Sequence, residues 1–292
     1  MLNKITYAIL GIGIFFVFSP RDVHDSTKNA VVSATTARSQ SFSNLVPSPE
    51  IRANLTQPAL TAKASVAFDL DSGTILYAKS LDELLPIASL TKLLTALVVV
   101  ENADSDDEVT IANAAEFTEG EIISVDNLLK AMLIASSNEA AMVLANFVAG
   151  SQENFSVLMN KKAEQMGLAA THFSTPVGWD IGDNYSNAWD LIKITQEFLK
   201  NSKLRQIVAT KEITITSSDG KLIHQLRNTN NLLHDNPNVV GIKTGFTAQA
   251  KGNLIVLINH SDSQILTIVL GSDNREDDTQ KLLDWAFQAY KW

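Results

Sequence analysis

A serine and a lysine separated by two residues begin an apolar segment directly after Pro86, in the stretch Ser89-Leu90-Thr91-Lys92. Residues i and i+3 share one face of a helix, so the Lys92 amine can reach the Ser89 hydroxyl. The first turn of a helix also offers unpaired N–H groups and a positive dipole end, which suit a developing oxyanion. The spacing predicts a serine nucleophile with a lysine base. Taken alone, a serine that caps a helix explains it better.

Lysine acts as a base near neutral pH only when its pKa falls by about 3 units, and burial together with a second nearby cation can produce such a shift. The pair therefore depends on other parts of the chain to produce this shift.

A second polar group, Ser136-Ser137-Asn138, interrupts a segment that is apolar over residues 128–135. Burying such groups without hydrogen-bond partners costs about 1–3 kcal/mol each. We predict a kink that exposes them to a polar cleft. A set of satisfied buried polar groups is the alternative interpretation.

The third group ends a predicted strand in Lys243-Thr244-Gly245, followed by Phe246. Such a strand end presents a cation and a hydroxyl beside a glycine that lets a ligand lie against the backbone. An edge-strand lysine with a turn glycine is the alternative. In this order, the three groups match the active-site set of serine β-lactamases and penicillin-binding proteins.

Two further segments repeat the first two patterns in the wrong context. Residues 218–221 read Ser-Asp-Gly-Lys but lie in a predicted turn with no helix behind them. Residues 272–274 read Ser-Asp-Asn directly before the last predicted helix, where such residues are ordinary caps. We interpret both as chance matches.

The elements that must position these groups are strands at both ends of the body and helices between them. A hairpin is predicted for residues 65–79 around Asp71-Ser72-Gly73. Helices are predicted at 89–101, 125–147, 154–166, 188–200 and 274–292, with Gly150 ending the second. Strands are predicted at 212–216, 222–226, 239–244, 253–259 and 264–270. The fold class is α+β, with an antiparallel sheet built from both chain ends and a helical block inserted between them.

Composition excludes several classes of function. The 292 residues carry a net charge of −9, which disfavours non-specific binding to nucleic acid. The chain has no cysteine, so thiol nucleophiles, disulfides and Cys-ligated zinc are excluded. The five histidines lack metal-ligand spacing. We expect neither a metal nor an organic cofactor, and no nucleic-acid partner.

The N-terminus predicts export. An apolar run over residues 5–18 follows Lys4 and is shorter than the roughly 20 residues of a membrane-spanning helix. Residues 1–20 are expected to be a signal peptide or an N-terminal membrane anchor, and whether they are cleaved stays open. Residues 21–60, rich in Ser, Thr, Asn, Ala and Pro, are expected to be a flexible linker. The catalytic domain would span 61–292, on the periplasmic or extracellular face of the cytoplasmic membrane.

From about residue 64 to 285 the chain resembles the D-alanyl-D-alanine carboxypeptidases, the low-molecular-mass penicillin-binding proteins. The stretches that carry the resemblance, beyond the three motifs, are residues 68–77, 86–92, 166–168, 171–173, 228–230 and 282–285. The resemblance implies a β-lactamase/transpeptidase-like fold. In that fold an antiparallel sheet is flanked by helices and carries an inserted helical subdomain.

The resemblance also implies a role for each site residue. Ser89 would be the nucleophile, Lys92 its base, and Ser136 a relay of the proton to the leaving D-alanine. The residues implied in substrate binding are Asn138, Lys243, Thr244, Gly245, Phe246 and Arg275. Among them, Thr244 and Arg275 would hold the substrate carboxylate, and the N–H groups of Ser89 and Phe246 would form the oxyanion hole.

The implied activity is that of a serine D,D-carboxypeptidase of peptidoglycan biosynthesis, acting in the cell wall and on cell shape. It would remove the terminal D-Ala from stem pentapeptides and would be trapped covalently by β-lactams. Many members carry a C-terminal β-domain with a membrane anchor. Because this sequence ends at Trp292, we expect any anchoring to come from residues 5–18. Lys251, where members usually have glycine, can alter the cleft rim.

Three other functions remain open. A D,D-endopeptidase that cuts cross-bridges would use the same residues. A class A β-lactamase deacylates through a glutamate followed four residues later by asparagine, a spacing shared by Glu197 and Asn201. A catalytically silent cell-wall binding module is the third. The intact motifs disfavour it, because an idle site need not retain them.

Overall fold

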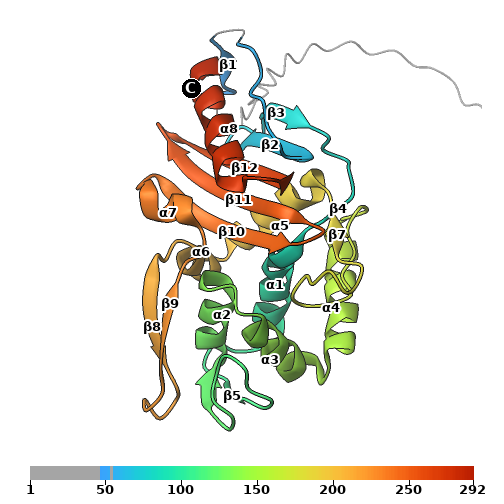
Figure 1. Ribbon diagram of the computed structural model, residues 1–292, viewed down its shortest axis with the longest axis vertical. Coiled ribbons are helices and arrows are strands. Elements are labelled where there is room, and N and C mark those ends of the chain that lie inside the picture. Colours follow the sequence, from blue (N-terminus) through green and yellow to red (C-terminus); the bar gives the residue numbers. More distant parts are fainter. Residues whose placement is uncertain (1–46, 53–54) are drawn as a thin grey trace, which may run out of the picture. The chain divides into compact units, whose positions relative to one another are not determined.

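The computed structural model of the protein describes residues 47–52 and 55–292 (Figure 1). The predicted export segment 1–20 and most of the predicted linker lie outside these residues. None of the helices in the described part has the length and apolar composition needed to cross a membrane.

A five-stranded antiparallel sheet organises the described chain, in the order β10-β11-β12-β2-β3. Its strands are β2 (Ala64–Asp69), β3 (Ile75–Lys79), β10 (Val239–Thr247), β11 (Lys251–His260) and β12 (Ser263–Ser272). The strands β12 and β2 pair directly, with Ile268 opposite Val66. The predicted sheet built from both ends of the body is thereby confirmed.

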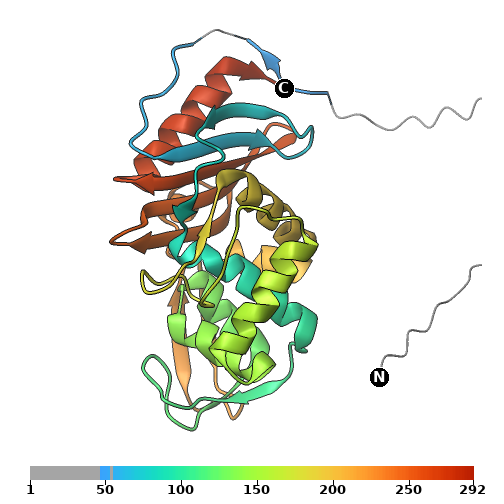
Figure 2. The ribbon, with the colours of Figure 1, turned by 90° about the vertical axis from the view of Figure 1, so that its right-hand side faces the viewer.

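Both faces of this sheet are covered, as Figure 2 shows. Helix α8 (Arg275–Ala289) packs on one face, where its Leu282 and Leu283 join Leu254 of β11. The neighbouring residue Ile255 belongs to the core shared with the helical block. Successive side chains of a strand point to opposite faces, so a strand between two cores must be apolar at nearly every position. The almost unbroken apolar run of β11 has this cause.

The helical block is inserted between β3 and β10. Its helices are η1 (Ala88–Thr91), α1 (Lys92–Asn102), α2 (Val125–Ile134), α3 (Asn138–Ala149), α4 (Gln152–Gln165), α5 (Ala188–Lys200), α6 (Ser202–Val208) and α7 (Asn231–Asp235). Three two-stranded ladders accompany them: β4 (Leu85–Pro86) with β7 (Tyr185–Ser186), β5 (Glu108–Thr110) with β6 (Ile122–Ser124), and β8 (Glu212–Thr216) with β9 (Ile223–Arg227).

The prediction of one helix over residues 125–147 is wrong. The chain forms α2 and α3, separated at residues 135–137, because Ser137 caps the second helix by accepting the N–H of Ala140 at 3.0 Å. A polar side chain that satisfies a new helix start competes with continuing the old one. The stop at Gly150, which has a φ of 76°, is confirmed.

Two further boundaries differ from the expectation. Helix α8 ends at Ala289, and β13 (Tyr290–Lys291) then pairs with β1 (Glu50–Ile51). Residues 50–51 are therefore part of the folded body, although the linker was expected to reach residue 60.

The strands β8 and β9 form a hairpin of their own rather than joining the main sheet.

Candidate active site

Ser89 lies in the short helix η1, and Lys92 begins α1, so the two share the start of one helical segment. Lys92 Nζ donates to Ser89 Oγ at 2.9 Å and to Asn138 Oδ1 at 2.7 Å. The Lys92 side chain is 0% exposed. Burial disfavours its charged form and lowers the pKa of Lys92 to about 7, against the opposing charge of Glu116. The predicted contact between Ser89 and Lys92 is confirmed.

The break between α2 and α3 presents Ser136 to the same cleft. Ser136 has a φ of 61°, a left-handed conformation that costs free energy for a non-glycine residue. Lys243 Nζ donates to Ser136 Oγ at 2.8 Å and to the carbonyl of Thr244 at 3.0 Å. Burial, followed by the charges of Lys92 and Arg275, lowers the pKa of Lys243 well below its ordinary value.

The strand β10 runs beside η1 at Gly245. A side-chain carbon at Gly245 would lie 3.0 Å from the carbonyl oxygen of Ile87 and 3.1 Å from the amide nitrogen of Ser89. A larger residue at this position would push β10 and η1 apart by a few tenths of an ångström. Arg275 Nη1 donates to the carbonyl of Gly245 at 3.0 Å, which brings the guanidinium to this strand. Phe246 follows on β10 with its ring largely exposed.

A buried carboxylate beside the second motif holds the loop that carries Glu116. Glu139, the residue after Asn138, accepts the backbone N–H groups of Ala115, Glu116 and Phe117. Carboxylates that accept several backbone N–H groups form strong charge-assisted hydrogen bonds. Glu139 thereby keeps the Glu116 charge near Lys92.

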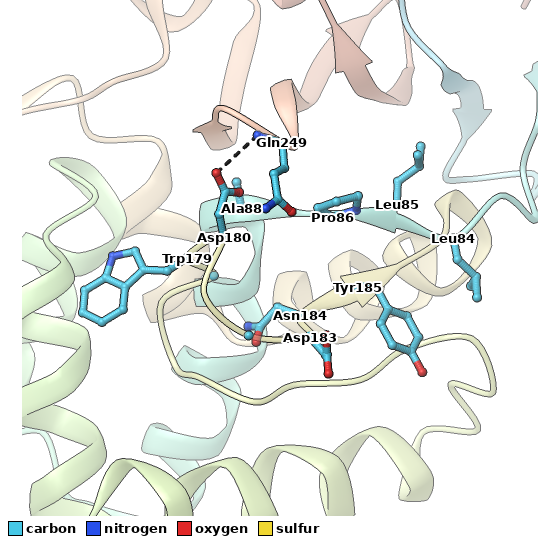
Figure 3. A pocket seen from close by; sticks show the side chains of 12 residues that line it. Leu84, Leu85, Pro86, Ala88, Trp179, Asp180, Asp183, Asn184, Tyr185 and Gln249 are labelled. Carbon is cyan, nitrogen blue, oxygen red and sulfur yellow. Dashed lines mark hydrogen bonds between the residues drawn. The ribbon is translucent and has the colours of Figure 1, made fainter.

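The loop after α4 packs against η1 beside the serine. Ala88, directly before Ser89, has a φ of 47° and lies against Gly178 of this loop. A cavity of about 240 Å³ opens here, between residues 84–88 and the segment 178–185, as Figure 3 shows. The backbone N–H of Gln249, in the turn after β10, donates to Asp180 at 3.2 Å across this region. The contact joins the loop to the end of the strand.

Gly178→Ala is expected to destabilise the protein strongly and to lower its activity. At Gly178 the φ is +82°, and a side-chain carbon would lie 2.0 Å from the carbonyl oxygen of Ala88 and 2.6 Å from Thr91 Oγ1. The loop must therefore move away from η1. Thermal unfolding would show a lower midpoint, whereas Gly73→Ala, at a similar φ but with nothing within 4 Å, measures the backbone cost alone. Equal midpoints for the two variants would contradict the close packing.

The structure brings together all the residues that the sequence nominates for the site. Ser89, Lys92 and Asn138 form one hydrogen-bonded group, and Ser136 and Lys243 form a second that adjoins Thr244. The guanidinium of Arg275 lies beside the site, because it donates to the carbonyl of Gly245. Their individual roles remain predictions.

Sequence reasoning missed the position of Thr229 beside the third motif. Its Oγ1 lies 2.6 Å from Thr244 Oγ1, although 15 residues separate the two. The sequence signal was the stretch 228–230, which was used only as a sign of family resemblance. Gly178 was also missed, since a lone glycine in a loop carries no specific signal.

The alternative residues lie elsewhere. Glu197 pairs with Lys200 on α5, and Asn201 caps α6 by accepting the N–H groups of Lys203 and Leu204. Both side chains are engaged in local contacts, which removes the observation that favoured a class A β-lactamase. The serine–lysine repeat at 218–221 lies in the β8–β9 hairpin, and Asn274 caps α8, so both matches were rightly set aside.

Known proteins with a similar sequence belong to the class that this arrangement of residues indicates. Residues 52–274 match peptidase family S11, described as D-alanyl-D-alanine carboxypeptidase. The chain is 35% identical over 246 residues to D-alanyl-D-alanine carboxypeptidase DacF of Bacillus subtilis, covering 79% of this chain and 63% of that protein. With DacC of Escherichia coli it shares 33% identity, covering 80% of this chain and 63% of the relative. The chain thus spans about 63% of the length of these curated relatives.

Solved structures show the same fold. The DD-transpeptidase of Streptomyces K15 superposes with a TM-score of 0.74 at 31% identity, covering 80% of this chain and 99% of that chain. Penicillin-binding protein D2 of Listeria monocytogenes, in its ampicillin-bound form, superposes with a TM-score of 0.70 at 28% identity, covering 78% and 98%. The predicted α+β, β-lactamase/transpeptidase-like fold is confirmed. By sequence, fold and the assembly of its three motifs, the chain belongs to the D-alanyl-D-alanine carboxypeptidase family of penicillin-binding serine peptidases.

Proposed function

We propose that the protein is a serine D-alanyl-D-alanine carboxypeptidase that removes the terminal D-alanine from peptidoglycan stem pentapeptides. The observation that carries this proposal is the contact between Lys92 Nζ and Ser89 Oγ, 2.9 Å long, with a lysine whose pKa is about 7. A buried amine that is half neutral at physiological pH is suited to accept the proton of a serine nucleophile.

In the acylation step, Ser89 Oγ attacks the carbonyl carbon of the penultimate D-alanine while its proton passes to Lys92 Nζ. The new C–O bond places negative charge on the carbonyl oxygen, which the N–H groups of Ser89 and Phe246 would stabilise. Each such donor contributes about 3–4 kcal/mol to lowering a barrier of this kind. Asn138 accepts a hydrogen bond from Lys92 and thereby fixes the amine in the cleft.

Collapse of the tetrahedral intermediate breaks the C–N bond, and the departing amine of D-alanine takes a proton. Ser136 would relay to it the proton that Lys92 accepted from Ser89: its hydroxyl gives its own proton to the amine and takes the proton of Lys92 in exchange, while a hydrogen bond from Lys243 holds the hydroxyl in the cleft. Water then hydrolyses the ester on Ser89, releases the shortened peptide and returns the hydroxyl. The cation of Arg275 and the hydroxyl of Thr244 would hold the terminal carboxylate during these steps.

The direct test is to incubate the protein with a stem pentapeptide that ends in D-Ala-D-Ala and to measure free D-alanine. Mass spectrometry of the protein after treatment with benzylpenicillin provides the second measurement. We expect release of one D-alanine per peptide and a single penicilloyl adduct on the peptide that contains Ser89. Absence of both from a folded protein would overturn the proposal.

A second candidate is transfer of the acyl group to an amine instead of water. It is favoured by the structural neighbour from Streptomyces K15, which is named a DD-transpeptidase. Adding glycylglycine to the peptide reaction distinguishes the two outcomes, because a transpeptidase would form a new amide product while still releasing D-alanine. We expect hydrolysis to dominate.

We further propose that the protein is exported and works at the outer face of the cytoplasmic membrane, with residues 1–20 as its signal peptide or its membrane anchor. The support is the apolar run that follows Lys4. Fractionating cells that express the full chain, with N-terminal sequencing of the recovered protein, tests it. An intact N-terminus in the membrane fraction supports an anchor. A shortened chain outside the membrane supports a cleaved signal, and a cytoplasmic location would contradict export.

A further inference from the structure

The hydroxyl groups of Thr229 and Thr244 form a short hydrogen bond at the point where the proposed carboxypeptidase would hold the substrate carboxylate. Their oxygens are 2.6 Å apart. Thr244 lies on β10 and is 4% exposed, with Lys243 before it and Gly245, the hydrogen-bond partner of Arg275, after it. Thr229 reaches it from the segment between β9 and α7.

Only one of the two hydroxyl protons lies between the oxygens. Which threonine donates it decides whether Thr244 can donate to a carboxylate. A carboxylate only accepts hydrogen bonds. If Thr244 donates to Thr229, its remaining lone pairs face the carboxylate and repel it. If Thr229 donates to Thr244, the Thr244 proton is free to point at the carboxylate. A bound carboxylate therefore requires Thr229 to be the donor.

Thr229 is held rigidly enough to act in this way. Its backbone N–H donates to the carbonyl of Ile134 at 3.2 Å, which ties it to the end of α2 two residues before Ser136. The buried side chain of Asn228 donates to the carbonyls of Val208 and Thr210 at 3.2 and 3.0 Å. Its Oδ1 also accepts the N–H of Asn230. A donor that is fixed before the substrate arrives loses little entropy on binding.

We propose that Thr229 is a positioning residue that orients the hydroxyl of Thr244 toward the terminal carboxylate of the substrate. This role rests on the proposed carboxypeptidase function. A hydroxyl that accepts one hydrogen bond also becomes a better donor in the next, so Thr229 strengthens the contact as well as directing it.

The test compares two substrates, diacetyl-L-Lys-D-Ala-D-Ala and the same peptide with a C-terminal carboxamide. Thr229→Val keeps the shape of the side chain and removes its donor. It is expected to lower kcat/KM about tenfold for the carboxylate peptide, mainly through KM. For the carboxamide it should change kcat/KM by less than about twofold, because the carboxamide NH₂ can itself donate to Thr244. Thr229→Ser is expected to restore the preference for the carboxylate.

Two further variants complete the test. In a Thr244→Val background, Thr229→Val should cause no additional loss, since the group that it orients is gone. Thr74→Val, which removes a hydroxyl that accepts a hydrogen bond from Ser72 Oγ at 2.9 Å in the turn between β2 and β3, should leave both substrates unaffected.

Equal losses on the two substrates, failure of serine to rescue, or a further loss without the Thr244 hydroxyl would each overturn the role of Thr229. A parent protein that hydrolyses neither peptide and is not acylated by benzylpenicillin would instead overturn the proposed function, and the role of Thr229 with it. The two failures are therefore distinguishable.

Discussion

Replacement of Ser89 by alanine is expected to lower D-alanine release by at least about 10³-fold and to abolish the covalent penicillin adduct. The covalent step needs an oxygen at this position, and no other hydroxyl in the site lies within hydrogen-bond distance of Lys92. The fold should persist, since removing one partly exposed hydroxyl leaves the packing of η1 unchanged. The measurements are the rate of D-alanine release and the mass of the protein after benzylpenicillin treatment.

Ser218→Ala is the matched control, because Ser218 and Lys221 repeat the serine–lysine spacing in the β8–β9 hairpin. It is expected to keep parental activity and to form the adduct. A Ser89→Ala protein that still releases D-alanine at the parental rate would show that another nucleophile acts. Loss of activity in Ser218→Ala would show that the wrong motif has been assigned.

Replacement of Lys92 by methionine is expected to lower the rate of acylation by about 10²- to 10⁴-fold, the range for loss of a general base. Lys92→Arg should be equally inactive, because a guanidinium stays protonated and cannot accept the Ser89 proton. Stopped-flow acylation by a chromogenic β-lactam measures the rate. Lys221→Met is the control and should match the parent, since its lysine lies in the exposed hairpin turn and pairs with Asp219.

The parent should also show a defined pH profile. The neutral form of Lys92 is the base, and its pKa is about 7. Acylation should therefore fall tenfold per pH unit below about 7 and level off above it. A profile that is flat from pH 5 to pH 9 would exclude Lys92 as the titrating base.

The lowered pKa of Lys92 also makes the free energy of unfolding depend on pH. The sign of this dependence follows from the protons that Lys92 binds in the folded and in the unfolded protein. Between pH 7 and 10.5 the unfolded lysine binds a proton that the folded one does not. Stability therefore rises with pH in this window, by up to about 1.4 kcal/mol per pH unit relative to Lys92→Met. Urea unfolding of both proteins at pH 7.5 and 9 measures the difference. No change in that difference with pH would contradict a lowered pKa.

Local patterns in the sequence were sufficient for much of the fold. The hairpin at Asp71-Ser72-Gly73, the helix at residues 188–200 and the strands of the main sheet follow from turn residues and from apolar spacing. These signals act between residues a few positions apart. The same holds for the contact between Ser89 and Lys92, which helical spacing alone predicts. The polar stretch Ser136-Ser137-Asn138 indicated a kink, but the predicted helix was continued through it to residue 147, and only the cap at Ser137 shows that a separate helix begins there.

The sequence alone specifies the identity and order of the three motifs, the α+β class and the serine–lysine pair. Which distant groups lie beside one another in the site depends on the folded arrangement. Lys243 bonds Ser136 across 107 residues, and Thr229 bonds Thr244 between separate elements. The lowered pKa of Lys92 likewise comes from complete burial, to which many parts of the chain contribute. Such contacts and such desolvation depend on how the helical block packs against the sheet, and no spacing along the chain encodes that packing.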